Sequence, residues 1–188
     1  MKILLSFEDV LLYQDDLLCL TDGQWITDKI IEFHFATLQN KSIEARFIPP
    51  NICHLLSSLR TSQYGEFIVK EALEHATLYF AINNAEECEL DGTHWTLLVI
   101  SGCNATHYDS MNSLQNKAKA QKITHSIGLF RSLNPLKCNL SIQQRNGFDC
   151  GIYVCWFAEC LALNQDISHP PRDYRKVLLN RIHKLMVD

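Results

Sequence analysis

Three side chains that occur together in nucleophilic enzymes lie in the second half of the chain: a cysteine, a histidine and an aspartate. Cys150 follows the polar stretch NGFD and begins a long apolar run. Because the N–H groups at a helix N-terminus favour negative charge, a cysteine placed there is suited to act as a thiolate nucleophile. A cysteine that only packs at the start of a helix is the alternative, and it is the commoner case for this position alone.

A base and an orienting acid are expected from two neighbouring strand-like segments. His94 begins HWTLLVI, and Asp109 lies near the end of NATHYDS. If the two strands pair, both residues reach the same sheet edge, where Asp109 can fix one imidazole tautomer while the other nitrogen faces Cys150. His107 is a competing base, although its place on the strand of Asp109 predicts a deeper position in the sheet. Taken singly, His94 also fits a surface histidine and Asp109 a turn-forming acid.

Acyl transfer also requires hydrogen-bond donors for a developing oxyanion. Gln144 lies six residues before Cys150, so its carboxamide is a candidate donor together with the Cys150 backbone N–H. An ordinary polar loop residue is the alternative for Gln144. Gly147 and Gly151 flank the cysteine and would allow the backbone to approach a reacting carbonyl closely.

The elements that must position these residues predict an α+β domain with helices before and after a central sheet. The N-terminal residues 2–13 suggest a short strand or extended arm, followed by a helical or irregular stretch. Aromatic and aliphatic runs separated by turn-prone residues indicate the strands, and apolar periodicity indicates the helices. Expected strands are 77–83, 94–100, 104–110 and one within 138–144; expected helices begin near Thr27 or Asp28 and near Pro50, and cover 116–130, 150–164 and 173–186.

Two of these helices have apolar positions that we expect to face the core, whereas the helix after Cys150 is apolar on nearly all sides and should be central. The inward positions are Ile30, Ile31, Phe33, Phe35 and Leu38 in the first helix, and Tyr174, Val177, Leu178, Ile182 and Leu185 in the last.

Composition bounds the possible classes of protein. The 188 residues suit a single domain spanning 1–188, and 47% apolar residues suffice for a core. A net charge of −4 with scattered basic residues argues against nucleic acid as a partner. No segment reaches the about 18 to 20 apolar residues of a membrane helix, and Glu8 and Asp9 interrupt the apolar N-terminus. We therefore expect an intracellular protein of the cytoplasm or nucleus that does not bind a membrane.

The eight cysteines are expected to be mostly free thiols in such a compartment. Cys150, Cys155 and Cys160 are each five residues apart, which spreads them around a helix and does not suit a metal site. No metal and no other cofactor is expected, and Cys155 and Cys160 are interpreted as packing residues.

Three segments in order, GTHWTLLV, HYDS and QQRNGFDCGIYV, resemble the ubiquitin-like-protein-specific cysteine proteases of the sentrin/SUMO-specific type. The resemblance implies a papain-like fold with a central mixed β-sheet flanked by helices, and a catalytic cysteine at the N-terminus of a buried helix. It also implies the triad His94, Asp109 and Cys150, with Gln144 at the oxyanion hole.

The segment WITDKIIEF extends the resemblance upstream. It implies that Trp25 and Trp95 form a narrow tunnel over a Gly-Gly tail, a selection that fits glycine because it alone lacks Cβ. Asp28 is expected to meet basic residues of the substrate protein, as are the acidic loop residues Glu86, Glu87 and Glu89, for which a solvated loop is the simpler alternative.

The resemblance is nearest to the deneddylase branch of the family, because of the opening ILLSFEDVLL and the loop before His94. It implies a monomeric protease or isopeptidase that cleaves after the C-terminal Gly-Gly of a ubiquitin-like modifier, most like the cullin modifier, in conjugates or precursors. A desumoylating protease, an acetyltransferase on the same scaffold and an inactive modifier-binding module are the alternatives. The acetyltransferase would require a site for coenzyme A phosphates, and the sequence contains no evident basic cluster.

Overall fold

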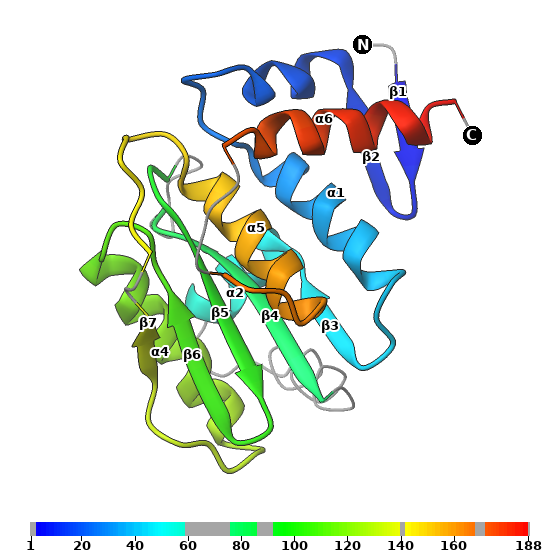
Figure 1. Cartoon of the computed structure of the whole chain (residues 1–188). Helices are drawn as coiled ribbons and strands as arrows, with labels where there is room; N and C mark the ends of the chain where they lie inside the picture. The colour runs from blue at the N-terminus through cyan, green and yellow to red at the C-terminus, as the bar shows by residue number, and fades with distance from the viewer. Residues whose placement is uncertain (1–2, 59–75, 86–91, 140–141, 168–171, 188) are drawn as a thin grey trace.

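The centre of the protein is a mixed five-stranded sheet, seen in a computed structural model that describes residues 3–58, 76–85, 92–139, 142–167 and 172–187 (Figure 1). The strand order is β3-β4-β5-β6-β7. The central pairs β4-β5 and β5-β6 are antiparallel, whereas the outer pairs β3-β4 and β6-β7 are parallel. The strands are β3 (Ala45–Ile48), β4 (Thr77–Asn83), β5 (Trp95–Ser101), β6 (Asn104–Tyr108) and β7 (Lys137–Asn139).

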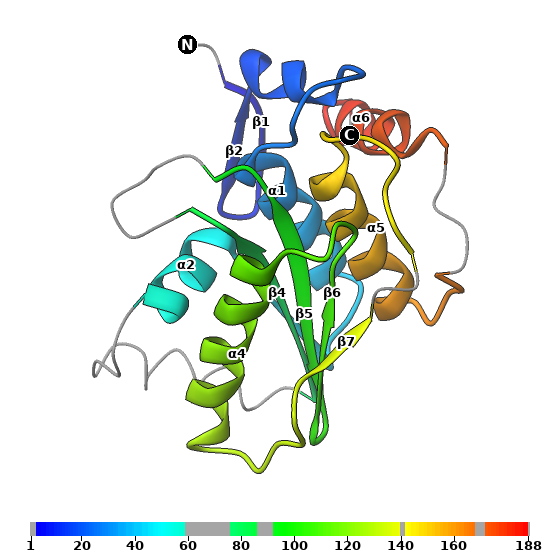
Figure 2. The same ribbon diagram turned by 90° about the vertical axis from the view of Figure 1, so that its left-hand side faces the viewer.

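Helices cover both faces of this sheet, as Figures 1 and 2 show. Tyr79 and Leu97 pack with α1 (Asp28–Gln39) and α5 (Cys150–Ala162) in one core. Phe80 and Leu98 point to the opposite face and pack with α2 (Pro50–Ser58) and α4 (Leu114–Gly128) in a second core. Since successive strand residues face opposite sides, a sheet buried on both faces needs continuous apolar strands, which explains the runs in β4 and β5.

A smaller layer lies beyond α1 and α5. It contains the hairpin β1 (Ile3–Phe7) and β2 (Val10–Tyr13), the 3₁₀ helix η1 (Gln14–Leu20) and α6 (Tyr174–Leu185), which brings the two ends of the chain together (Figure 1). α6 packs against η1. The first and last segments of the chain therefore form one layer on the side of α1 and α5 that faces away from the sheet.

The α+β prediction is confirmed, and the element bounds differ in informative ways. β4 covers the predicted 77–83, and α5 begins at Cys150 as expected. β5 begins at Trp95 and β6 ends at Tyr108, so His94 and Asp109 lie just outside the strands. The strand expected within 138–144 was wrong in extent, because β7 covers only Lys137–Asn139 and residues 142–144 are not in a strand. β3 and the β1-β2 pairing were not expected.

Two details of the helices also differ from expectation. Thr27 is at the N-cap position of α1, but its side chain makes no capping hydrogen bond, and its hydroxyl lies 3.7 Å from the Cys19 sulfur. In α6, Tyr174, Leu178 and Ile182 are buried as predicted. Val177 is 40% exposed, so its assignment to the inward stripe was wrong.

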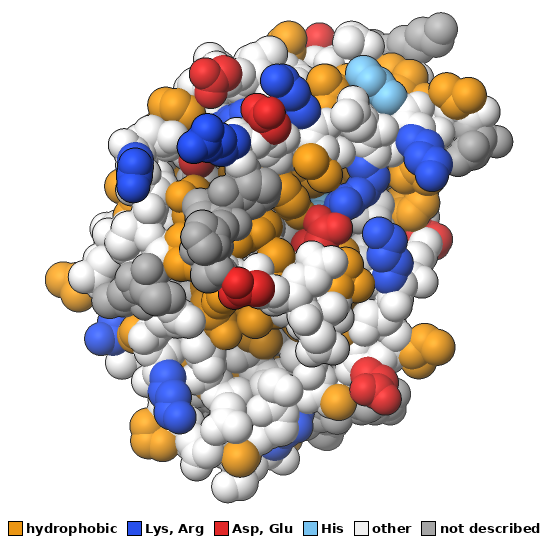
Figure 3. Space-filling view, viewed as in Figure 1, with side chains coloured by type: hydrophobic (Ala, Val, Ile, Leu, Met, Phe, Trp, Pro, Cys, Tyr) orange, Lys and Arg blue, Asp and Glu red, His pale blue; other side chains and the backbone are white. Residues whose placement is uncertain are grey.

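The surface of the small layer is richer in basic side chains than the rest of the face that Figure 3 shows, since Lys and Arg gather over α6. None of the helices in the described ranges is long and apolar enough to cross a membrane. The seven cysteines among the described residues are free thiols; Cys88 lies outside these residues. Cys155 is fully buried, and burial raises the pKa of its thiol, as expected for a packing residue.

Candidate active site

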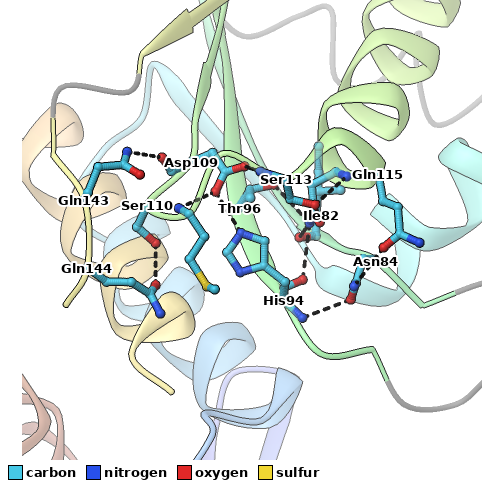
Figure 4. A network of polar contacts seen from close by, with 12 residues as sticks. Ile82, Asn84, His94, Thr96, Asp109, Ser110, Ser113, Gln115, Gln143 and Gln144 are labelled. Atoms are coloured by element: carbon cyan, nitrogen blue, oxygen red, sulfur yellow. Dashed lines mark hydrogen bonds and ion pairs between the residues drawn. The ribbon is translucent and has the colours of Figure 1, made fainter. Parts of the chain in front are cut away.

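His94 and Asp109 meet at one edge of the sheet because β5 and β6 form an antiparallel pair. The register places Leu97 opposite Tyr108, so the residue before β5 and the residue after β6 lie at the same end. The His94 Nε2 atom is 2.7 Å from Asp109 Oδ1, and both side chains are buried. Figure 4 shows the imidazole pointing toward the carboxylate. The predicted proximity of these two residues is confirmed.

The Asp109 carboxylate is fixed by two backbone donors besides the imidazole. Oδ1 accepts the N–H of Met111 at 2.8 Å, and Oδ2 accepts the N–H of Ser113 at 2.5 Å. Burial alone would raise the pKa of Asp109, but the hydrogen bond to His94 and these two N–H groups lower it below its ordinary value. Asp109 is therefore ionised at neutral pH.

The imidazole of His94 is held in its charged form by this environment. Burial alone would lower its pKa, but the hydrogen bond to Asp109 and the interactions with Cys150 raise the pKa to about 9. The other ring nitrogen, Nδ1, is buried and makes no hydrogen bond within the described part of the chain. His94 thus has one nitrogen on Asp109 and one that remains available to a reacting group.

Cys150 is the candidate nucleophile of this arrangement. It is the first residue of α5 and is 2% exposed. Its interaction with His94 raises the pKa of the imidazole. The N-terminus of α5 favours negative charge on the Cys150 sulfur. The structure therefore brings Cys150, His94 and Asp109 together from three separate segments.

His107, the competing base, is part of the sheet interior. It pairs with Leu98 across β5 and β6, and its Nε2 is 2.9 Å from the Thr96 hydroxyl. Burial lowers the pKa of His107 to about 4, so the ring is neutral at pH 7. The deeper position predicted for His107 is confirmed, and it is His94 that contacts Asp109.

Two asparagines that the sequence did not indicate hold the backbone of His94. The Asn84 Oδ1 atom accepts the N–H groups of Thr93 and His94 at 2.7 and 2.9 Å. The Asn116 side chain is fully buried at the start of α4 and donates to the carbonyls of His94 at 3.2 Å and Ile82 at 3.1 Å. Figure 4 shows Asn84 on the backbone side of the histidine. A single asparagine has no diagnostic spacing, so neither residue could be found from the sequence.

Gln144 lies beside the Asp109 turn. Its Oε1 accepts the Ser110 hydroxyl at 2.6 Å (Figure 4), and its Nε2 donates to the Asn146 carbonyl at 2.6 Å. Its backbone N–H donates to the Ser110 carbonyl at 3.0 Å. An amide nitrogen has two N–H groups, so one remains for another acceptor. The side chain is therefore oriented by contacts on both sides.

The two tryptophans are connected to the segments around Cys150. Trp25 is 53% exposed, and its indole N–H donates to the Gly147 carbonyl at 3.0 Å. The indole N–H of Trp95 donates to the Ile26 carbonyl at 3.2 Å. A half-exposed indole held by a hydrogen bond is a common feature of binding surfaces.

The glycines that flank Cys150 have different surroundings. A Cβ atom on Gly151 would lie 2.7 Å from Ile26 Cβ, whereas a Cβ on Gly147 would meet no atom within 4 Å. Gly151 is therefore required by the close approach of the Trp25–Ile26 segment to α5. Gly151 was expected to make room for a reacting carbonyl. In the structure it makes room for the Ile26 side chain.

Asp28 is exposed in the first turn of α1, and its Oδ1 accepts the N–H of Lys29 at 2.9 Å. The structure leaves its carboxylate accessible but does not connect it to the triad. The acidic loop residues Glu86, Glu87 and Glu89 lie outside the described residues.

The chain has counterparts among known proteins. The C-terminal catalytic domain of the Ulp1 protease family matches residues 24–171. The chain belongs to the Ulp1 protease family. The resemblance drawn from the three ordered motifs is thereby confirmed, as is the class of enzyme, a cysteine-type peptidase.

Curated relatives in this family come from distant eukaryotes. The chain is 32% identical to the sentrin-specific protease 8 of Rattus norvegicus, over 86% of this chain and 80% of the relative. It is 29% identical to the probable sentrin-specific protease 8 of Dictyostelium discoideum, over 81% and 72% of the two chains. It is 28% identical to the NEDD8-specific protease 1 of Arabidopsis thaliana, over 87% and 80%.

Solved structures share the fold. The C-terminal Ulp1 protease domain in complex with SMT3, the yeast ortholog of SUMO, matches with a TM-score of 0.78 at 19% identity, over the whole of this chain and 88% of that one. The Xanthomonas campestris effector XopD bound to ubiquitin matches with a TM-score of 0.64 at 18% identity, over 85% and 90% of the two chains. The mixed sheet flanked by helices is the architecture of these proteases.

Proposed function

We propose that the protein cleaves the bond after the C-terminal Gly-Gly of a ubiquitin-like modifier, most directly in deneddylation of cullins and other conjugates, and in processing of the modifier precursor. The observation that carries the proposal is the buried His94–Asp109 pair: Nδ1 of the imidazole has no hydrogen-bond partner among the described residues, and Cys150 raises the pKa of the ring. Membership of the protease family agrees with that chemistry.

In the proposed reaction the Cys150 sulfur attacks the terminal glycine carbonyl. The sulfur has given its proton to Nδ1 of His94 before the attack, in agreement with the raised pKa of the ring, and this imidazolium then protonates the leaving amine as the C–N bond breaks. Water hydrolyses the thioester and releases the modifier with a free carboxylate. Asp109 keeps Nε2 bonded throughout, so that Nδ1 remains the nitrogen that exchanges the proton.

The oxyanion of the tetrahedral intermediate needs donors aimed at it in advance. We assign this role to the backbone N–H of Cys150 and to the second N–H of the Gln144 amide. The bonds of Gln144 to Ser110 and Asn146 support the assignment, because they restrict the amide before the substrate arrives.

Trp25 and Trp95 are proposed to enclose the Gly-Gly tail. The indole N–H of Trp25 is bonded to the Gly147 carbonyl in the turn before Cys150, and the indole N–H of Trp95 is bonded to the Ile26 carbonyl next to Trp25, which restricts both rings. A chain that passes between two such rings must lack Cβ atoms, so diglycine is the expected sequence. Asp28 is proposed to meet a basic residue on the body of the modifier.

The choice of modifier rests on the relatives. Curated relatives of 28 to 32% identity include NEDD8-specific and sentrin-specific 8 proteases, so we propose NEDD8, the cullin modifier. A desumoylating activity is the second candidate, favoured by the fold shared with the Ulp1 domain that holds SMT3. The inactive binding module is disfavoured by the assembled triad, and the acetyltransferase is disfavoured because the sequence contains no evident basic cluster for coenzyme A phosphates. We further propose that residues 1–188 act as one catalytic domain and as a monomer, in the cytoplasm or nucleus, where free thiols such as these persist.

A cleavage assay tests this proposal. Purified protein is mixed with NEDD8 or SUMO bearing a C-terminal fluorogenic amide, and Cys150→Ala is compared with Cys103→Ala, which removes an exposed thiol. We expect release from NEDD8, loss of turnover with retained binding in Cys150→Ala, and normal turnover in Cys103→Ala. Turnover by Cys150→Ala would overturn the assignment of the nucleophile, and release from SUMO alone would overturn the choice of modifier.

A further inference from the structure

Arg175 in α6 contacts the turn that ends at Cys150. Its Nε and Nη2 atoms donate to Asp149 Oδ1 at 3.1 and 2.7 Å, and Nη2 lies 3.4 Å from the Phe148 carbonyl. The guanidinium carbon is also 5.7 Å from the centre of the Phe148 ring. Asp149 is the N-cap residue of α5, so the arginine binds the residue directly before the proposed nucleophile.

The same guanidinium contacts the segment that leads to Trp25. Nη1 donates to the carbonyls of Cys19 at 2.7 Å and Thr21 at 3.1 Å, and Nη2 donates to the Gln24 carbonyl at 2.6 Å. Gln24 directly precedes Trp25, whose indole is bonded to the Gly147 carbonyl. One side chain therefore connects the tryptophan segment with the cysteine turn.

The turn before Cys150 also has hydrogen bonds of its own, and Arg175 adds to them from outside the turn. The Asn146 Oδ1 atom accepts the N–H groups of Phe148 and Asp149 at 3.1 and 3.0 Å, and Asn146 Nδ2 donates to Asp149 Oδ2 at 2.8 Å. Asp149 thus has one oxygen on the turn and the other on Arg175. Displacing the arginine would release the carboxylate on the side that faces α6.

The chemistry of this contact requires a guanidinium. Its planar fork presents donors in several fixed directions, whereas a lysine ammonium is a single point charge. The Arg175 side chain is 11% exposed, so water replaces few of these bonds. A salt bridge at the surface would contribute little to stability. A mostly buried guanidinium that also donates to several carbonyls restricts the position of the backbone segments that it contacts.

We propose that Arg175 is a positioning residue, which aligns the Cys150 turn and the Trp25 segment for the reaction described under Proposed function, on which this inference rests. Arg175 lies outside residues 24–171, which match the catalytic domain of the family. The small layer would then contribute to catalysis through α6 as well as covering α1 and α5.

The test compares Arg175→Lys with Arg181→Lys. Arg181 is on the same helix, its side chain is 19% exposed, and it forms two bonds to Glu159. Among the described residues it bonds to Glu159 and His34, neither of which belongs to the cysteine turn or the tryptophan segment. Both variants are assayed on the NEDD8 amide at a temperature where circular dichroism shows each to be folded.

We expect kcat of Arg175→Lys to fall roughly 10- to 100-fold with a smaller change in KM, because small displacements of reacting groups cost rates of this order. Arg181→Lys should stay within about twofold of the wild type, since its bonds lie away from the reacting atoms. The rate of Cys150 carboxymethylation, followed by peptide mass, should change its pH profile in Arg175→Lys only. A role in stability alone would leave the pH profile of the folded protein unchanged.

Asp149→Asn provides a second variant if Arg175→Lys does not fold. It keeps the size of the side chain and removes its charge. It should also lower kcat, by a smaller factor than Arg175→Lys does. The inference is overturned if the folded variants of Arg175 and Asp149 both match Arg181→Lys in kcat and in the pH profile. A wild-type protein that cleaves no modifier amide would instead contradict the proposed function.

Discussion

At the scale of single residues, the charge on His94 depends on burial and on two neighbouring side chains, which act in opposite directions. Burial favours the neutral ring, and the Asp109 carboxylate and Cys150 favour the imidazolium, with the result that the pKa rises to about 9.

Asp109→Asn should therefore move the alkaline limb of the rate profile. An amide bears no negative charge, so the pKa of His94 should fall toward its ordinary value, and kcat/KM should drop by roughly 10²- to 10⁴-fold. The measurement is kcat/KM on the NEDD8 amide between pH 5 and about 10. His107→Gln is the control, because His107 bonds to Thr96 and not to Asp109. An equal shift of the limb in both variants would contradict the role given to Asp109.

The sequence could predict that His94 and Asp109 meet, because each lies at the end of one of two neighbouring strands. Asn116 and Arg175 could not be predicted in this way, since each is a single polar residue whose partners are distant in the chain. The bond from Arg175 to the Cys19 carbonyl spans 156 positions, and no local pattern indicates such a contact.

At the scale of elements, α5 and the segment Trp25–Ile26 approach each other so closely that only glycine fits at position 151. Ile26 is buried, and its Cβ would lie 2.7 Å from a Cβ on Gly151. A larger side chain at position 151 would therefore push the start of α5 and the segment that bears Trp25 apart.

Gly151→Ala should lower the free energy of unfolding by about 1 to 3 kcal/mol, as overpacked sites do, and reduce kcat as the Trp25 segment shifts. Gly128→Ala is the matched control, because a Cβ there meets no atom within 4 Å, and alanine in a helix should be neutral or stabilising. Urea unfolding measures the free energy of unfolding of both variants. Equal stability of the two would show that α5 and the segment can separate freely.

Elements could be predicted where burial on both faces leaves a strong pattern. β4 was found with its full extent because its five central residues are all buried. β7 is a three-residue edge strand with mostly exposed side chains, so the apolar pattern did not define its end. Val177 fits the helical spacing of the inward stripe of α6, but the small layer does not extend far enough to cover it.

At the scale of the whole molecule, α1, α5 and α6 are joined by a buried polar cluster. His34 in α1 bonds to the Cys155 carbonyl at 3.0 Å and, through Nδ1, to Arg181 at 3.0 Å. Arg181 in turn pairs with Glu159 at 2.8 Å, and Tyr174 donates to the same carboxylate. Burial and the nearby guanidinium lower the pKa of His34 to about 4, so the ring is neutral in the folded protein.

The free energy of unfolding should therefore decrease as the pH is lowered below 7. Between about pH 6.5 and 4 the unfolded chain binds protons at His34 and His107 while the folded protein does not. Each histidine should then lower the free energy of unfolding by up to about 1.4 kcal/mol per pH unit in that window. His94 acts oppositely, because its pKa is raised: its contribution is complete below about pH 6.5 and is lost as pH rises through about 9.

Urea unfolding between pH 7 and 4 measures the acid slope. His34→Gln should reduce it by removing one titrating ring, and His125→Gln, a change on the surface of α4, is the matched control. An unchanged slope in His34→Gln would contradict the account of the buried cluster.

The arrangement of the whole could be predicted least. The class α+β followed from the succession of elements, but not the order of the five strands, the parallel outer pairs or the face that each helix covers. Those depend on contacts between segments far apart in sequence, such as β3 with β4 and α6 with η1. The family resemblance supplied the part of the architecture that local patterns do not specify.

The central claim is that Cys150 attacks the carbonyl of the terminal glycine in the Gly-Gly tail of NEDD8. The most direct measurement mixes the protein with NEDD8, SUMO and ubiquitin, each with a C-terminal electrophile, and locates the adduct by intact mass and peptide mapping. The account predicts one covalent adduct with the NEDD8 probe, at Cys150, and none in Cys150→Ala. Labelling of another cysteine, labelling by the SUMO probe alone, or no labelling by any probe would contradict it.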